Sequence, residues 1–358
     1  MSLIQQRGLH ISRARDLAGR PVLAVSGLMN FQLPLRLAFY NLCLYLLILA
    51  LGLWALTQGD YDLSPAQVLQ ALKGGSDDAL ASYFVREVRA PRIVAALLVG
   101  LALGVSGAIF QIISGNSLGS PDIIGFTYGA ATGALINIII FDAGPLGIAC
   151  GAISGGLVSS LIVWFLTRQT GLRGTRLVLI GLGLGATLSA LNALLVVGAS
   201  LTQAQTAASW MAGSLNTMNW GKISFLALGL VILLPLSWSL SRPLGSLTFG
   251  GQIAVGLGVP LTKVRVTALF VGVLLVSLAT AVTGPLAFVA LAAPHLARKI
   301  TRVQGAGLAS AAATGACLVL LSDLIGQYAF RAPLQVGVVT GALGGIYLVY
   351  LIAMEGKR

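Results

Sequence analysis

Three arginines, Arg86, Arg89 and Arg92, stand at the entrance to an apolar run in the stretch REVRAPRIVAALLVG. A spacing of three places side chains along one broad side of a helix, so the three guanidinium groups could form a shared basic surface. Such a surface could receive carboxylates of an acidic partner, or it could anchor the helix at the level of the lipid headgroups. Which role applies depends on the side of the membrane that the arginines face.

Covalent chemistry is not suggested by the remaining residues. His10 and His295 are the only histidines, and the three cysteines lie in apolar segments without a CxxC pair. The sequence contains neither HExxH nor GxxxxGK[ST], the patterns of a zinc protease and of a phosphate-binding loop. We therefore expect no catalytic residue, no metal site and no cofactor in this chain, and if ATP supplies energy another chain must bind it.

The composition predicts an all-α polytopic membrane protein. Of the 358 residues, 57% are hydrophobic and 9% are charged, and the mean hydropathy is +0.93, whereas charged residues make up about 25% of a soluble domain. The formal net charge of +12 does not indicate nucleic acid, because basic residues are expected in the loops between membrane spans.

Ten membrane spans can be placed along the chain. They are roughly 36–56, 93–113, 122–141, 145–166, 177–198, 223–240, 264–282, 285–300, 306–326 and 336–354. The eighth is too short to span unaided, so we expect a broken helix buried among its neighbours. Most lysines and arginines fall on one side if both termini lie in the cytoplasm, as the positive-inside rule requires. This topology puts Arg86, Arg89 and Arg92 on the outer face.

The domain organisation follows from the spans. Residues 1–35 are expected to form a cytoplasmic tail, and residues 36–358 a single transmembrane domain. In the first outer loop, Leu63-Ser64-Pro65 predicts a helix start, with Val68, Leu69 and Leu72 on one apolar side.

Polar residues on otherwise apolar spans are the candidates for the lining of a transport pathway. Ser189, Asn192 and Thr340 are such residues. The alternative for each is a hydrogen bond to its own helix, which is common for buried hydroxyls.

Five longer motifs resemble the iron-siderophore and vitamin B12 permease family of ABC importers. They are RAPRIVAALLVGLALGVSGAIFQIISGNSLGSPDIIGFTYGAATGA, WMAGSLNTMNW, GLGVPLTKVR, TGPLAFVALAAPHLAR and QVGVVTGALGGIYLVYL. The resemblance implies a type II importer permease in the bacterial inner membrane. It also implies four kinds of partner: a second permease subunit, two cytoplasmic ATPase subunits that hold ATP and Mg²⁺, a periplasmic binding protein, and a ferric siderophore. The segments LGSPDIIGF, GSLNTMNW and GGIYL are most similar in sequence to a ferric catecholate permease. This resemblance implies a heterodimer, although a homodimer stays possible.

The resemblance also assigns a docking role to the arginines. Family members receive carboxylates of the binding protein on outer arginines, and this role maps best onto Arg89 and Arg92, with Arg86 beside them. A further family arginine would fall near Gln327, so Arg331 is the candidate substitute. We expect the charge reversals Arg89→Glu and Arg92→Glu together to impair uptake while membrane insertion stays intact.

The cytoplasmic contacts map onto two further segments. The loop 244–260 is implied to couple the permease to the ATPase, through Ala254, Gly256, Leu257, Gly258 and Val259. Relatives carry acidic residues there and this chain has none, so small and apolar groups are expected to make the contact. The residues implied at the cytoplasmic gate are Asn116, Leu118, Gly174 and Thr175.

Together these observations predict a permease subunit that moves a ferric siderophore, of the catecholate class, from periplasm to cytoplasm. The alternatives are the same fold importing cobalamin, heme or a hydroxamate siderophore, and a secondary carrier without an ATPase. No acidic residue lies convincingly near the middle of a span, as a proton- or sodium-driven carrier would need.

Overall fold

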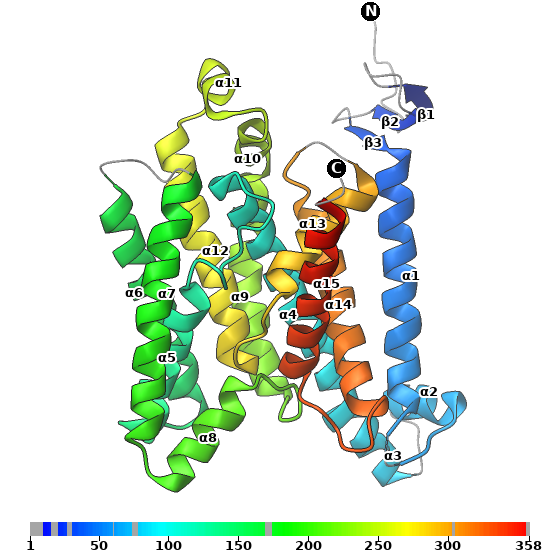
Figure 1. The fold of residues 1–358 in the computed structure, drawn as a ribbon. Helices are drawn as coiled ribbons and strands as arrows, with labels where there is room; N and C mark the ends of the chain where they lie inside the picture. The colour runs from blue at the N-terminus through cyan, green and yellow to red at the C-terminus, as the bar shows by residue number, and fades with distance from the viewer. Residues whose placement is uncertain are drawn as a thin grey trace, which may run out of the picture.

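The computed structural model describes residues 10–15, 21–26, 31–59, 61–73, 78–168, 174–302 and 305–355. Within these ranges long helices run side by side and form a bundle (Figure 1). The long helices are α1 (Leu35–Thr57), α4 (Ala90–Ser114), α6 (Pro145–Thr167), α7 (Gly174–Val197), α9 (Trp220–Ser239), α12 (Leu261–Thr283), α14 (Leu308–Tyr328) and α15 (Val336–Glu355). Two shorter helices, α5 (Phe126–Ile139) and α13 (Val289–Thr301), lie among them.

Every segment predicted to cross the membrane contains one of these helices. Seven helices of the described residues are long and apolar enough to span a bilayer. The other three segments hold α5 with 14 residues, α13 with 13 residues, and the apolar part of α15, Val336–Leu351. The number of ten crossings therefore stays a prediction, but the expected break in the eighth segment is present, because α13 begins only at Val289.

The N-terminal segment, which stays predicted as a cytoplasmic tail, contains short strands among its described residues. Three short strands, β1 (His10–Arg15), β2 (Pro21–Ser26) and β3 (Phe31–Pro34), pair as an antiparallel sheet in the order β1-β2-β3. The apolar β-branched residues Ile11, Val22 and Val25 favour extended backbone. The helical architecture thus begins at α1.

The two ends of the bundle carry different elements (Figure 1). One end, named the terminal face, holds β1–β3, the short helices α10 (Ser241–Leu247) and α11 (Gly251–Gly256), and the last turn of α15. The other end, named the opposite face, holds α2 (Pro65–Lys73), α3 (Ala79–Tyr83) and α8 (Leu201–Met211). In the predicted topology the terminal face is cytoplasmic and the opposite face is periplasmic.

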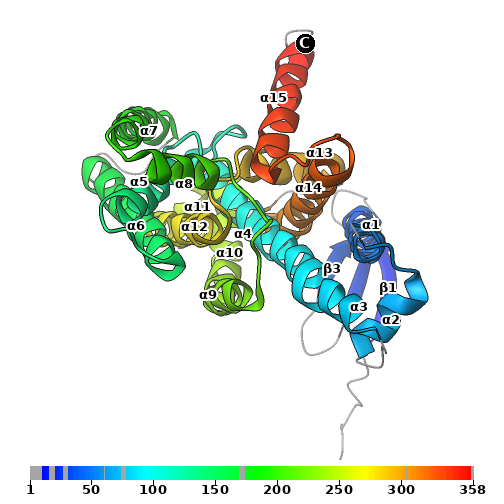
Figure 2. The same cartoon turned by 90° about the horizontal axis from the view of Figure 1, so that it is seen from below.

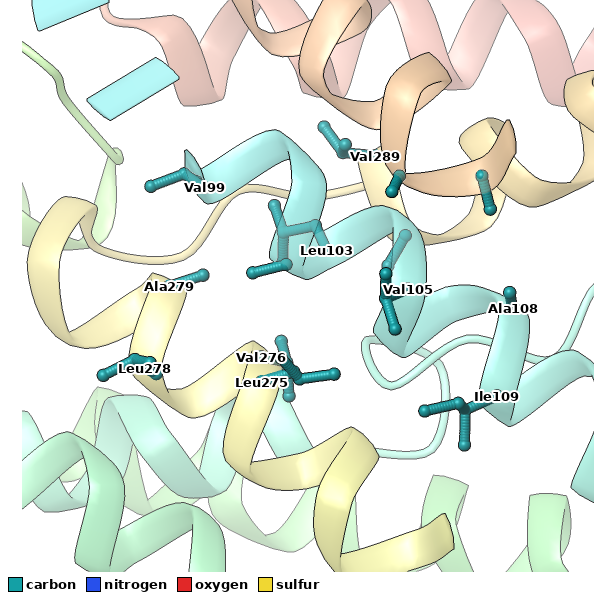
Figure 3. Close-up of a cluster of buried hydrophobic side chains, with 14 of the residues drawn as sticks. Val99, Leu103, Val105, Ala108, Ile109, Leu275, Val276, Leu278, Ala279 and Val289 are labelled. Atoms are coloured by element: carbon teal, nitrogen blue, oxygen red, sulfur yellow. The ribbon is translucent and has the colours of Figure 1, made fainter. Parts of the chain in front are cut away.

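The core is built around α4, which packs against α12, α13 and α14. Figure 3 shows the side chains of Leu103 and Ile109 from α4 next to Leu275 and Val276 from α12. Against α14 the backbones themselves approach: a Cβ on Gly100 would lie 2.3 Å from the carbonyl oxygen of Gly315. Small residues permit such close packing between helices in lipid, so α4 is held on several sides.

The short helices of the opposite face begin at side-chain caps. The Ser64 amide donates to Gln67 Oε1 at 2.8 Å, and the Gln67 amide donates to Ser64 Oγ at 3.3 Å, at the start of α2. This reciprocal pattern is a capping box, which confirms the predicted helix start. The predicted apolar side is only partly correct, because Val68 is buried whereas Leu69 and Leu72 are exposed. Helix α8, which lies in a segment expected to be a loop, starts at a second capping box formed by Ser200 and Gln203.

Candidate functional site

The three arginines at the start of α4 do not form one surface. A π-helical turn, Phe84–Arg89, precedes α4, and such a turn has more residues per turn than an α-helix. Arg86 and Arg89, which both lie in this turn, therefore diverge instead of staying on one side. Arg86 is exposed, Arg92 is half-buried and Arg89 is 8% exposed.

Arg89 is bound within the chain. Its Nη1 donates to the carbonyl oxygen of Leu56 at 2.8 Å, and its Nη2 donates to the carbonyl oxygen of Tyr61. Leu56 lies in the last turn of α1, where helix carbonyls have no partner in their own helix. Arg89 thus ties the end of α1 and the following loop to the start of α4.

Arg92 forms a bidentate ion pair with Asp323 of α14. Its Nε donates to Asp323 Oδ2 and its Nη2 to Asp323 Oδ1, both at 2.8 Å. The side chains are 19% and 4% exposed, and Gln327 Nε2 adds a further bond to Asp323 Oδ2 at 2.8 Å. Bidentate arginine–carboxylate pairs are the strong and geometrically specific ones. Nothing in the sequence indicated this pair, because it joins residues 231 positions apart.

Arg86 and Arg331 are the two predicted docking residues that are exposed. Arg86 Nη2 donates to the Leu72 carbonyl at 2.9 Å, and the Trp220 indole nitrogen donates to the Arg86 carbonyl at 2.9 Å. Arg331 lies between α14 and α15, at the opposite face. A docking role for all four arginines stays a prediction, and the geometry favours Arg86 and Arg331 over Arg89 and Arg92.

A carboxylate of the opposite face caps α3. The Asp78 Oδ1 atom accepts from the amides of Leu80 and Ala81 at 3.0 and 3.2 Å, and Oδ2 accepts from the Tyr61 hydroxyl at 2.7 Å. The hydrogen bond from Tyr61 is the largest cause that holds the pKa of Asp78 below its ordinary value, and the bonds from the two amides act in the same direction. In return, the Asp78 carboxylate raises the pKa of Tyr61. The pair fixes the outer loop near Arg89.

The predicted coupling loop forms two short helices at the terminal face, α10 and α11. Leu244, Leu247 and Ala254 are buried and attach them to the bundle. An exposed apolar set, named the coupling patch, consists of Phe249, Ile253, Val255 and Leu257, which are 55%, 55%, 57% and 65% exposed.

Of the predicted coupling residues, Gly256, Leu257 and Gly258 are exposed, Val259 is half-buried, and Ala254 points into the bundle. Sequence reasoning missed Phe249, Ile253 and Val255. The sequence feature that could have indicated these exposed apolar residues is the absence of any charged residue from 244 to 260.

The predicted gate residues lie close to this region. Asn116 Oδ1 accepts from the Leu118 amide at 2.9 Å, so these two residues form a tight turn after α4. Gly174, at the start of α7, lines a cavity of about 810 Å³ together with Ser114, Gly115 and residues of the loop between α10 and α12. The backbone of Thr175 lies in α7, and its side chain is outside the described residues. The turn, the start of α7 and the coupling helices therefore share one end of the bundle.

A second cavity, named the central cavity, has a volume of about 690 Å³. Its lining comes from five segments: the turn before α5 together with α5, then α7, the end of α8, the break between α12 and α13 with the first turn of α13, and the first turn of α15. Figure 2 shows α7 and α15 on the same side of the bundle. The lining is mostly apolar, with hydroxyl and carboxyl groups at Ser120, Asp122, Thr127, Tyr128 and Ser189.

The predicted pathway residues divide into three cases. Ser189 lines the central cavity. Asn192 is buried and its Nδ2 donates to the Tyr128 carbonyl at 3.4 Å, so it braces α7 against α5. Thr340 donates to the Gly337 carbonyl of its own helix at 3.1 Å, the alternative that the sequence left open. Within the described ranges, no group of three or more His, Cys, Asp or Glu side chains is placed to hold a metal ion.

Comparison with known proteins places the chain among transport permeases. Residues 46–354 match the model of the FecCD transport family. The chain is 43% identical over 308 residues to the ferric enterobactin transport system permease protein FepG of Escherichia coli (strain K12), covering 86% of this chain and 93% of that protein. It is 36% identical over 315 residues to the achromobactin transport system permease protein CbrC of Dickeya dadantii (strain 3937), covering 87% and 90%.

Two more distant relatives agree with this placement. The vitamin B12 import system permease protein BtuC of Escherichia coli O157:H7 is 32% identical over 321 residues, covering 88% of this chain and 95% of that protein. A solved structure described as an inward-facing conformation of a metal-chelate type ABC transporter superposes with a TM-score of 0.79 at 28% identity, covering 88% of this chain and 99% of that one. The similarity therefore extends over nearly the whole helical bundle.

Proposed function

The chain belongs to the FecCD transport family, and from that membership we propose that it is the subunit through which a ferric catecholate siderophore crosses the membrane. As a member it is a multi-pass permease of the bacterial inner membrane, of the kind that serves ABC importers of siderophores and vitamin B12. The observation that carries the finer assignment is the 43% identity with a ferric enterobactin permease over 86% of the chain.

The central cavity suits the passage of such a cargo. A ferric tris-catecholate is bulky and anionic, so the pathway that carries it must be wide and must bind the cargo only weakly. The cavity of about 690 Å³ has a mostly apolar lining with a few hydroxyl groups and the Asp122 carboxyl group, and its described lining holds no lysine or arginine. It therefore provides no strong ionic trap for an anion. We propose that a second permease subunit completes the pathway by covering the side of the bundle where α7 and α15 lie.

The exposed apolar side chains of α7 and α15 support this pairing. Leu179, Leu182 and Leu194 of α7 are 62%, 46% and 68% exposed. Ile346 and Val349 of α15 are each 69% exposed. A second permease could cover part of this surface, with lipid covering the remainder.

The two ends of the chain serve different partners in this proposal. At the opposite face, Arg86 and Arg331 meet carboxylates of the periplasmic binding protein, while Arg89 and Arg92 hold the helix start that presents Arg86. At the terminal face, the coupling patch inserts into a cytoplasmic ATPase, which binds ATP and Mg²⁺. Closure of two ATPase subunits would then move α10 and α11, and with them the helices that line the pathway.

Uptake by cells that lack the gene tests the cargo. We expect loss of radio-iron uptake from a ferric catecholate, with normal uptake from a ferric hydroxamate and normal uptake of labelled cobalamin, and recovery when the gene is returned. Failure of cobalamin or hydroxamate uptake in place of catecholate uptake would overturn the cargo and keep the permease assignment. Normal uptake of all three, in cells without a second catecholate importer, would contradict the proposed transport role.

A further inference from the structure

Phe288 has an unusual backbone conformation at the break between α12 and α13. Its φ angle is 68°, and within the described residues only Asp142 and Arg302 share a positive φ among residues other than glycine. The left-handed region is unfavourable for a bulky side chain and persists where surrounding contacts hold it. Such positions gather at functional sites, so the contacts of Phe288 identify what holds it.

Asp122 makes the holding contact from a distant segment. The Phe288 amide donates to Asp122 Oδ2 at 3.3 Å, and the Thr127 hydroxyl donates to Asp122 Oδ1 at 2.6 Å. Phe288 immediately precedes α13, where amide groups have no acceptor in the helix itself. The Asp122 carboxylate supplies that acceptor, and it ties the α12–α13 break to the first turn of α5.

Gly344 of α15 provides the seat for Phe288. A Cβ added to Gly344 would lie 2.1 Å from Phe288 Cβ and 2.2 Å from its Cγ, whereas a Cβ on the neighbouring Gly345 would have no atom within 4 Å. The position of Phe288 Cβ is set by the backbone, so a change of rotamer could move Cγ but could not relieve the contact with Cβ. The middle of α15 can therefore approach the break only while residue 344 has no side chain.

Phe288 also faces the space that the proposed function uses. It lines the central cavity together with Asp122 and Tyr128. We propose that Phe288 contacts the cargo from the side of the pathway. In this proposal Asp122 is the positioning residue that holds the backbone of Phe288. Gly344 leaves the space on α15 into which Phe288 packs, and this space is named the seat. The inference rests on the proposed function, because it takes the central cavity as the pathway. The ring offers an apolar aromatic face, which suits the aryl groups of a catecholate.

Adding a methyl group at position 344 and removing the side chain at position 288 tests the packing of Phe288 against Gly344, and this test needs no cargo. Gly344→Ala should lower the thermal stability of the purified permease, while the matched control Gly345→Ala, which meets no atom, should leave it unchanged or raise it slightly. Phe288→Gly removes the atoms that the new methyl group meets and accepts a positive φ, so it should restore the stability of Gly344→Ala. Equal effects of Gly344→Ala and Gly345→Ala, or no rescue by Phe288→Gly, would overturn the assignment of the seat.

Transport in proteoliposomes tests the role of the ring. The importer is reconstituted with its ATPase and binding protein, and ferric catecholate delivery and ATP hydrolysis are measured together. Gly344→Ala should lower the ferric catecholate delivered by each folded complex, because the added methyl group displaces Phe288 from its place against α15. Phe288→Ala should change the KM for the loaded binding protein or the cargo delivered per ATP, whereas a purely structural ring would lower only the amount of folded complex. An unchanged KM and an unchanged yield per ATP in Phe288→Ala would contradict cargo contact.

The positioning role of Asp122 has its own signature. Asp122→Asn keeps an oxygen that accepts from the Phe288 amide and should retain transport, while Asp122→Ala should not. In the Phe288→Gly background the strained backbone no longer needs holding, so Asp122→Ala should add no further loss. Additive losses would show that Asp122 acts independently of Phe288. If the wild-type importer carries no ferric catecholate, the proposed function is wrong. The stability measurements at positions 288 and 344 would still test the packing of Phe288 against Gly344, because they do not depend on the cargo.

Discussion

At the residue scale, Arg92 and Asp323 illustrate what a charge near a membrane helix requires. Each of the two hydrogen bonds between them measures 2.8 Å, and the Asp323 side chain is 4% exposed. Removing one partner leaves the other charge with little water to replace it. From these contacts we now expect the charge reversals at Arg89 and Arg92 to lower the amount of folded protein as well as uptake, in place of the intact insertion that we expected from the sequence.

The first prediction concerns this ion pair. Asp323→Ala should lower the free energy of unfolding by about 2–3 kcal/mol, less than the full cost for a buried pair because the Arg92 side chain is 19% exposed. The control Gln327→Ala loses one hydrogen bond to Asp323 and should cost about 1 kcal/mol. Denaturant unfolding in detergent measures both, and equal values for the two variants would contradict a structural ion pair.

The second prediction separates structure from docking at the same position. The exchange Arg92→Asp with Asp323→Arg restores an ion pair with the charges reversed, so the double variant should be more stable than either single variant. Binding of the periplasmic protein should then survive if Arg92 only holds α4. Restored stability with lost binding would instead show that Arg92 itself docks the partner.

The third prediction concerns pH. The pKa of Asp78 lies below its ordinary value in the folded protein, so its stabilising cap is complete at neutral pH and is lost as the pH falls through that lowered pKa. Tyr61→Phe removes the first cause of the shift, so the loss should begin at a higher pH. Limited proteolysis of the outer loop between α1 and α4 at stepwise lower pH measures this, and identical pH profiles for the two proteins would contradict it.

At the element scale, helix positions were predictable where the chain is apolar for long enough, and the contacts between elements were not. Residues 285–300 were too short to span and indeed hold a break, since that prediction needs only local length and composition. The Arg89 contacts with Leu56 and Tyr61 depend on segments that lie 33 and 28 residues away. A π-helical turn also displaced the arginines from the spacing that an α-helix would give.

The fourth prediction concerns the coupling patch. Each large apolar side chain that becomes buried in a partner contributes about 1.5–3 kcal/mol, so Ile253→Asp should weaken ATPase binding by about tenfold or more. The control Gln252→Ala changes an exposed polar residue of the same helix and should have little effect. Co-purification of the ATPase at low and high salt measures this. Because the loop 244–260 carries no charge, binding should resist salt, and loss of the complex at high salt would contradict an apolar contact.

At the scale of the whole molecule, the sequence predicted the class of transport protein but not the residues that line the central cavity. The apolar segments and the family motifs indicated a permease, and the family match over residues 46–354 agrees with that prediction. The central cavity was not predictable, because its lining comes from five segments far apart in the chain, and of the three proposed pathway residues only Ser189 lines it. Polarity on an apolar helix does not distinguish a side chain that faces a cavity from one that bonds its own helix, as Thr340 does.

Transport by purified components is the decisive test of the proposed permease. Proteoliposomes that hold this permease with its ATPase and second permease subunit are supplied with the loaded binding protein and radio-labelled ferric catecholate. We expect the ferric catecholate to accumulate inside the vesicles only when ATP is present. Labelled cobalamin and ferric hydroxamate should not accumulate. Accumulation of cobalamin or hydroxamate in place of the catecholate, or accumulation of the catecholate without ATP, would contradict the proposed function.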